Sequence, residues 1–224
     1  MEHARRRLRV YHFLNRKYGL QDIRRRRLKV STINELNDPF ELIGIASKDR
    51  DVRQAYADTK AGLAKYGGLL CFSGNWRNPV QWSHYADRHR GLCLGFDVTA
   101  QLTPVTYASK RLKPDLAAMK TGGAPAQAHM LRMLTTKFSH WRYENEHRLF
   151  VRLKSKDKKT GFYFFRFSKR VALREVIVGP NSTITRAELG RTLGNMATNA
   201  EVYKARLAFR TFRVVRQRSG KLWK

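Results

Sequence analysis

The spacing of apolar positions predicts short strands separated by helices of unequal length. Apolar runs typical of strands occur at 8–14, 28–32, 69–75, 91–98, 147–153, 161–167 and 175–179. Helices are predicted within 19–27, 49–68, 79–90, 128–141 and 185–197, and a last strand within 201–224. Because the elements do not alternate as regular β-α-β units, we expect an α+β protein with a split antiparallel or mixed sheet flanked by helices.

Turn and cap residues mark several boundaries between these elements. In "NDPFE", residues 37–41, Pro39 restricts Asp38 to an extended conformation, which predicts a turn. Thr185 followed by Glu188 forms a capping box at the start of the last helix. The glycines of "TGGAPAQ", residues 121–127, predict a loop before the helix at 128–141.

The chain is strongly basic, with 46 Lys and Arg residues against 17 Asp and Glu and a formal net charge of +29. Solubility alone requires a charge of only about 2 to 8 in a small domain. Nucleic acid is therefore the expected partner, since Lys and Arg neutralise phosphates. An anionic membrane is less favoured because the basic residues are spread along the chain. The expected phosphate contacts are Arg24, Arg25, Arg26, Arg27, Arg213, Arg216 and Arg218.

Composition also bounds the organisation of the chain. A hydrophobic fraction of 42% is enough for one folded domain over residues 1–224, with a basic segment at 201–224. Cys71 and Cys93 lie in apolar runs, typical of buried thiols and not of disulfides or metal ligands. The histidines have no metal-ligand spacing, so no metal is expected. Without an apolar leader or membrane span, a cytoplasmic protein is expected.

Glu144 and Glu146 are the first candidates for chemistry. Alternation along a strand that starts near Glu144 would place both carboxylates and Arg148 on one face. Paired carboxylates suit a reaction with an oxocarbenium-like transition state, in which one stabilises positive charge and the other orients the attacking group. The alternative is a surface ion pair between Glu146 and Arg148 with little energetic consequence. The two glutamates alone favour that ion pair.

Further candidates lie in two other segments. His12 interrupts an apolar strand, where histidine is usually a core residue with one satisfied nitrogen. The stretch 71–91 contains Ser73, Trp82 and Tyr85, and its aromatic residues could form a wall for a planar ring or could serve packing alone. The chain has no P-loop, no GxGxxG after a strand and no GxSxG elbow, which disfavours kinases, Rossmann oxidoreductases and serine hydrolases.

Four segments together resemble a large bacterial family of uncharacterised proteins. They are "NDPFE" (37–41), "CFS" (71–73), "QWSHYADRHRGLCLGFD" (81–97) and "WRYENEHRLF" (141–150), within a region of similarity that spans about residues 8–180. The order of the pieces is also similar to the ADP-ribosyltransferase superfamily. That resemblance implies NAD as a substrate, with late carboxylates at Glu144 and Glu146. It implies His12 as the NAD contact of the first strand and Ser73 or Tyr85 as the middle element, with Ser31 and Thr32 as alternatives. Trp82, from the aromatic segment, is a further candidate for an NAD contact.

The leading hypothesis is an NAD-consuming ADP-ribosyltransferase-like enzyme whose basic surface recruits a nucleic acid or a nucleic-acid-associated target. The first alternative is a non-catalytic nucleic-acid-binding protein that stacks bases on Trp76, Trp82 and the strand "FYFFRF" (162–167). The second alternative is a metal-dependent nuclease that uses Asp38, Glu41 and the two late glutamates.

Overall fold

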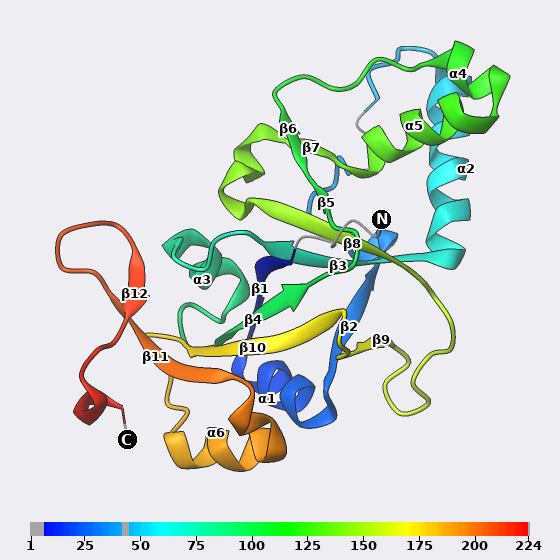
Figure 1. Ribbon diagram of the computed structural model, residues 1–224. Coiled ribbons are helices and arrows are strands. Elements are labelled where there is room, and N and C mark those ends of the chain that lie inside the picture. The colour runs from blue at the N-terminus through cyan, green and yellow to red at the C-terminus, as the bar shows by residue number, and fades with distance from the viewer. Residues whose placement is uncertain (1–6, 42–44, 224) are drawn as a thin grey trace, which may run out of the picture. The chain divides into compact units, whose positions relative to one another are not determined.

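A computed structural model describes residues 7–41 and 45–223 of the chain, shown as a ribbon in Figure 1. The chain divides into two compact units, each assembled from separate stretches of sequence. The first unit comprises residues 1–29, 72–101 and 164–224, and the second comprises 30–71 and 102–163. Mixed helix and strand content confirms the predicted α+β class.

The first unit is built on a mixed sheet. Its strands are β1 (Leu8–Leu14), β4 (Leu92–Val98), β10 (Val171–Val178), β11 (Glu201–Leu207) and β12 (Val214–Arg216), in the spatial order β12-β11-β10-β4-β1. Strand β4 is antiparallel to β1 and β10, whereas β11 is parallel to β10. Every residue of β4 is buried, as the mostly apolar sequence of 92–98 predicts for a central strand. Its charged residue, Asp97, pairs with Arg9 at 2.7 Å.

Three helices accompany this sheet: α1 (Arg16–Arg25), α3 (Pro79–Tyr85) and α6 (Arg186–Leu193). Helices α1 and α6 lie side by side in Figure 1, and Arg16 binds Glu188 between them at 2.8 Å. The N-cap half of the predicted capping box is confirmed, because the Thr185 hydroxyl accepts a hydrogen bond from the Glu188 amide. The Glu188 carboxylate binds Arg16. The remaining elements are β9 (Tyr163–Arg166), η3 (Gly194–Thr198) and η4 (Gly220–Leu222).

The second unit contains shorter strands and three helices. Strands β2 (Arg27–Thr32) and β3 (Gly67–Ser73) pair antiparallel, and β8 (Glu146–Arg152) pairs with β3 and with β5 (Thr103–Pro104). Strands β6 (Thr106–Ala108) and β7 (Thr136–Phe138) form a parallel pair. The helices are α2 (Arg50–Tyr66), α4 (Leu116–Thr121) and α5 (Gly123–Leu134), with 3-10 turns η1 (Ile33–Glu35) and η2 (Ser139–Glu144).

The helix predicted at 128–141 was wrong at both ends. Helix α5 begins at Gly123, inside the predicted loop, and ends at Leu134. The hydroxyls of Thr135 and Thr136 donate to the carbonyls four residues earlier, a geometry that competes with continued helix, and β7 starts directly afterwards. This correction moves Lys137 from a predicted helix to a strand.

Candidate functional site

The turn at residues 37–41 places two acidic side chains in the interior of the second unit. Asp38 accepts the Glu41 amide on its carbonyl at 3.0 Å and the Phe40 amide on its Oδ1 at 2.9 Å, which closes the predicted turn. Asp38 is 3% exposed and Glu41 is 2% exposed. A buried carboxylate is costly without a cation or hydrogen-bond donor, so each of these groups requires partners.

Glu144 and Glu146 reach the same cluster through a left-handed residue. Glu144 ends η2, Glu146 begins β8, and Asn145 between them has φ 45° and ψ 53°. Asparagine is one of the few residues that adopts this conformation readily. The two carboxylates do come together, whereas the strand predicted to start at Glu144 actually starts two residues later.

Lys137 lies among three carboxylates. Its Nζ lies 2.6 Å from Glu144 Oε2, 3.1 Å from Glu41 Oε1 and 3.3 Å from Glu146 Oε2. The lysine side chain is 2% exposed, so these contacts are made almost without water. Asn37 completes the shell by accepting from Lys137 at 3.1 Å and donating to Glu144 at 3.3 Å.

Arg148 is the second buried cation. Its Nε donates to Glu146 Oε1 at 2.8 Å and its Nη2 to Glu146 Oε2 at 3.1 Å, so both oxygens of Glu146 are engaged. The same Nη2 lies 2.5 Å from Glu41 Oε2, and Nη1 donates to the Leu134 carbonyl. The predicted Glu146 and Arg148 ion pair therefore exists, but it is buried, where breaking a pair is far more costly than at the surface.

We call Glu41, Lys137, Glu144, Glu146 and Arg148 the ion cluster. Burial opposes ionisation of Glu146, but Arg148 and Lys137 outweigh burial and lower the pKa of Glu146 to about 2. Burial is the stronger influence at Glu41 and raises its pKa despite Arg148 and Lys137. For Lys137, burial is outweighed by the three glutamates, which raise its pKa. At neutral pH, Glu146 and Lys137 are therefore charged.

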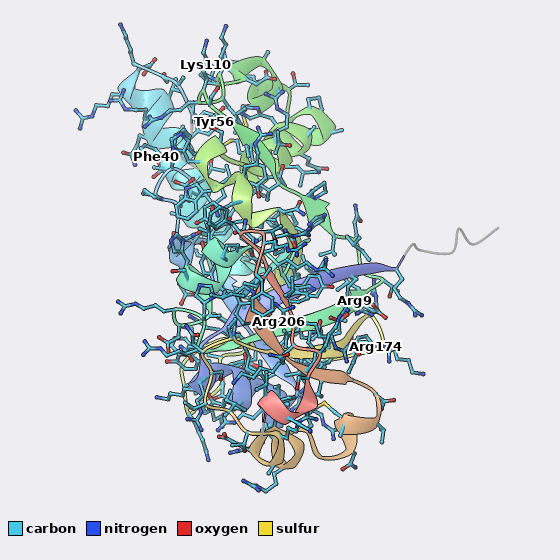
Figure 2. The ribbon with its side chains drawn as sticks, turned by 90° about the vertical axis from the view of Figure 1, so that its left-hand side faces the viewer. Arg9, Phe40, Tyr56, Lys110, Arg174 and Arg206 are labelled. Carbon is cyan, nitrogen blue, oxygen red and sulfur yellow. The ribbon has the colours of Figure 1, made fainter. Side chains whose placement is uncertain are left out.

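A pocket of about 290 Å³ shares Lys137 with the ion cluster. Two aromatic side chains line it, Phe40 and Phe138, which are 46% and 40% exposed. Lys110 and Arg111 add positive charge, and the Arg111 guanidinium lies 4.7 Å from the centre of the Phe40 ring. Phe40 and Lys110 are labelled in Figure 2. The pocket thus combines ring faces with cations.

Asp38 also lines this pocket and has an unused acceptor. Its Oδ1 caps the turn, whereas its Oδ2 is buried and accepts no hydrogen bond from the described part of the chain. A buried oxygen without a donor is rare in folded proteins and calls for an explanation. A ligand with a hydroxyl or amine group would supply the missing donor.

The proposed NAD contacts outside the ion cluster lie in the first unit. His12 packs edge-on against Phe72, with ring centres 5.9 Å apart. Ser73 is buried and accepts hydrogen bonds from the Asn75 amide and the Gln81 side chain. Tyr85 is partly buried against the core. These residues belong to one unit, and Glu144 and Glu146 belong to the other.

Trp82 and Trp76 are core residues and not stacking surfaces. Trp82 is 0% exposed, packs edge-on against Phe13 at 5.3 Å and donates from its indole to the Trp76 carbonyl at 2.6 Å. Trp76 is 7% exposed. The packing interpretation of this aromatic segment is therefore the correct one, because a fully buried indole has no face to offer a base or a nicotinamide.

Most of the arginines expected to contact phosphate are accessible. Arg24, Arg25, Arg26, Arg213, Arg216 and Arg218 are exposed. Arg27 is half-buried, with its guanidinium 3.5 Å from the centre of the Phe164 ring. Arg216 pairs with Glu201, which leaves less of its charge for a ligand.

Sequence reasoning missed the residues that link the ion cluster to the pocket. Lys137 was assigned to a predicted helix, and nothing in the sequence distinguished Lys110 and Arg111 from the many other basic residues. A useful signal was the pair of threonines at 135 and 136, which are β-branched, disfavour helix and precede Lys137. Asp38 was predicted to lie in a turn, and its only proposed functional role was that of a metal ligand in a nuclease.

Among residues 7–41 and 45–223, no group of three or more His, Cys, Asp or Glu side chains is placed to hold a metal ion. The glutamates of the nuclease hypothesis instead surround Lys137 and Arg148. Within the same residues, every helix is too short or too polar to cross a bilayer. No protein-family model, curated protein or solved structure matches the chain.

Proposed function

We propose that the protein is an NAD-dependent ADP-ribosyltransferase-like enzyme that acts on a nucleic acid, with the pocket of the second unit as its NAD site. The observation that carries the proposal is Asp38 Oδ2, a buried acceptor that receives no hydrogen bond from residues 7–41 and 45–223, in a pocket of aromatic and cationic side chains. This combination matches the parts of a nucleotide: a planar ring, hydroxyl groups and a phosphate.

Each part of the ligand has a candidate partner. Phe40 and Phe138 offer ring faces, Lys110 and Arg111 offer charge for a phosphate, and Asp38 accepts from a ribose hydroxyl or an amine. The volume of about 290 Å³ lies just below the usual range of small-molecule pockets, about 300 to 1,000 Å³. We therefore assign one nucleoside half of NAD to the pocket, with the other half outside it.

Glu144 is the better candidate for the reacting carboxylate. Glu146 is held by both buried cations, Arg148 and Lys137, whereas Glu144 is held by Lys137 and by the neutral side chain of Asn37. Lys137 is also one of the residues that line the pocket. In the proposed reaction, nicotinamide leaves with the electron pair of its bond to ribose C1′, and a carboxylate stabilises the developing positive charge. A nucleophile of the target then bonds to C1′ and releases its proton to water.

Labelled NAD tests the activity directly. The protein is incubated with NAD carrying label in its ADP-ribose part and with total cellular RNA, DNA or protein, and the fraction that acquires label is identified. We expect label in nucleic acid and its loss in Glu144→Gln. Labelling at the wild-type rate by a folded Glu144→Gln protein would exclude Glu144 from the mechanism, and label in no fraction would exclude the activity.

The pocket needs variants that keep the fold. Phe40→Ala and Arg111→Gln alter a pair of side chains at the pocket mouth, and Tyr66→Ala alters an exposed aromatic residue of α2 as a control. We expect the pocket variants to weaken NAD binding by calorimetry and the control to bind as wild type. Glu146→Gln serves as the structural comparison: it should lower the free energy of unfolding by about 3–5 kcal/mol, because it breaks a buried ion pair.

A non-catalytic nucleic-acid-binding protein is the second candidate. The specific observation that favours it is the engagement of Glu146 by Arg148 and of Glu144 by Lys137, which gives the carboxylates a structural role. It predicts salt-sensitive binding of nucleic acid with no turnover of NAD.

A further inference from the structure

The turn that joins β11 to β12 carries two almost completely uncovered phenylalanines. Phe209 is 90% exposed and Phe212 is 98% exposed. Burial of such a side chain is worth about 1.5–3 kcal/mol, so two exposed rings in one short turn are unfavourable unless something covers them. Both belong to residues 208–213, which we call the hairpin tip.

The hairpin tip stands on a fixed base. Val214 is fully buried in the core of the first unit, together with Ala205 and Tyr203. Within the tip, the Ala208 amide donates to the Arg213 carbonyl at 2.9 Å, and the Arg213 amide donates to the Thr211 carbonyl at 2.8 Å. The two rings are therefore presented by a hydrogen-bonded turn and not by a free chain end.

Arginines alternate with the two rings. The Arg206 guanidinium, labelled in Figure 2, lies 4.4 Å from the centre of the Phe209 ring. Arg210 and Arg213 are exposed on the tip itself, and the sequence has no acidic residue from 202 to 224. Aromatic faces with cations beside them are the means by which proteins hold unpaired bases and their phosphates.

We propose that the hairpin tip binds single-stranded nucleic acid, with bases stacked on Phe209 and Phe212 and phosphates contacted by Arg206, Arg210 and Arg213. The net charge of +29 favours a polyanion, and unpaired bases expose the flat faces that two separate rings can stack on. An anionic membrane fits less well because interfacial insertion needs a broader apolar face than two side chains. This inference adds a binding site for the nucleic-acid target of the proposed function. It rests on the proposed function only in taking nucleic acid as that target.

The test measures fluorescence anisotropy of a labelled single strand of about 12 nucleotides, within the site sizes of single-strand-binding modules. Phe209→Ala/Phe212→Ala should weaken binding about tenfold or more and leave its salt dependence unchanged. Arg210→Gln/Arg213→Gln should instead reduce the salt dependence. Tyr66→Ala, another exposed aromatic residue, should change neither. Because the altered side chains are exposed, circular dichroism of each variant should match wild type.

Three results would overturn the proposal. The double phenylalanine variant could bind the single strand as tightly as wild type, it could lose affinity for a duplex of equal length to the same degree, or it could lose only binding to phosphatidylserine vesicles. The last result would assign the tip to a membrane. If the hairpin tip is needed for binding but no fraction is labelled from NAD, the proposed enzyme activity is contradicted and the hairpin proposal stands. If the double phenylalanine variant labels RNA or DNA at the wild-type rate, the hairpin proposal is contradicted and the enzyme activity stands.

Discussion

Asp22 shows how a single buried side chain sets a pH dependence. It is 4% exposed in α1, and burial raises its pKa to about 7 although Arg27 opposes the shift. In the unfolded chain an aspartate has a pKa of about 3.9. The folded protein thus holds this proton more tightly, so the associated stability is complete below about pH 4 and is lost as pH rises to about 7.

Asp22→Asn should remove this dependence, because the amide stays neutral at every pH. We expect the variant to gain stability relative to wild type between about pH 4 and pH 7, with no further gain above pH 8. Urea unfolding at several pH values measures the difference in free energy of unfolding. Asp58→Asn, at an exposed position of α2, is the control and should show no such trend. A constant difference between Asp22→Asn and wild type would contradict the assignment.

At the scale of elements, the junction of η2 and β8 determines where the two late glutamates lie. The left-handed conformation of Asn145 ends the 3-10 turn and starts the strand. Asn145→Gly should preserve this junction, because glycine adopts positive φ without penalty. Asn145→Val should lower the free energy of unfolding by at least about 1–2 kcal/mol, the usual penalty of this conformation for other residues.

Urea unfolding compares these two variants with Asn195→Val, an exposed position in η3. The control should stay within about 0.5 kcal/mol of wild type, as surface substitutions usually do. Equal stability of Asn145→Val and Asn145→Gly would show that the left-handed turn does not hold the cluster together.

Strands with an apolar pattern could be predicted well, whereas the contents of the buried site could not. The run at 8–14 coincides with β1, and the Thr185 cap coincides with the start of α6, because both depend on local chemistry. The contact of Lys137 with Glu41 joins residues 96 positions apart (137 − 41) and depends on the fold of the whole unit. A lysine is expected to be exposed because of its charge. The burial of Lys137 could be predicted only by knowing that the fold surrounds it with three carboxylates.

At the scale of the molecule, the net charge of +29 predicts steep salt dependence for nucleic-acid binding. If the protein contacts four phosphates of a single strand, its affinity should fall about 50-fold when the salt concentration is raised from 50 to 200 mM. Titrations of the labelled strand at both concentrations measure the change. NAD, with only two phosphates, should respond much less, and affinity for the strand that is independent of salt would contradict a binding mode based on phosphates.

The interleaving of the two units has a consequence for synthesis of the chain. The second unit ends at residue 163, but strands β10, β11 and β12 of the first unit lie beyond that point. Strand β4 emerges from the ribosome early, and about 80 further residues must be synthesised before its partner β10 is available to pair with it. During that interval the mostly apolar strand β4 has one unpaired edge, so we expect the nascent chain to depend on chaperones until residues near 178 have emerged.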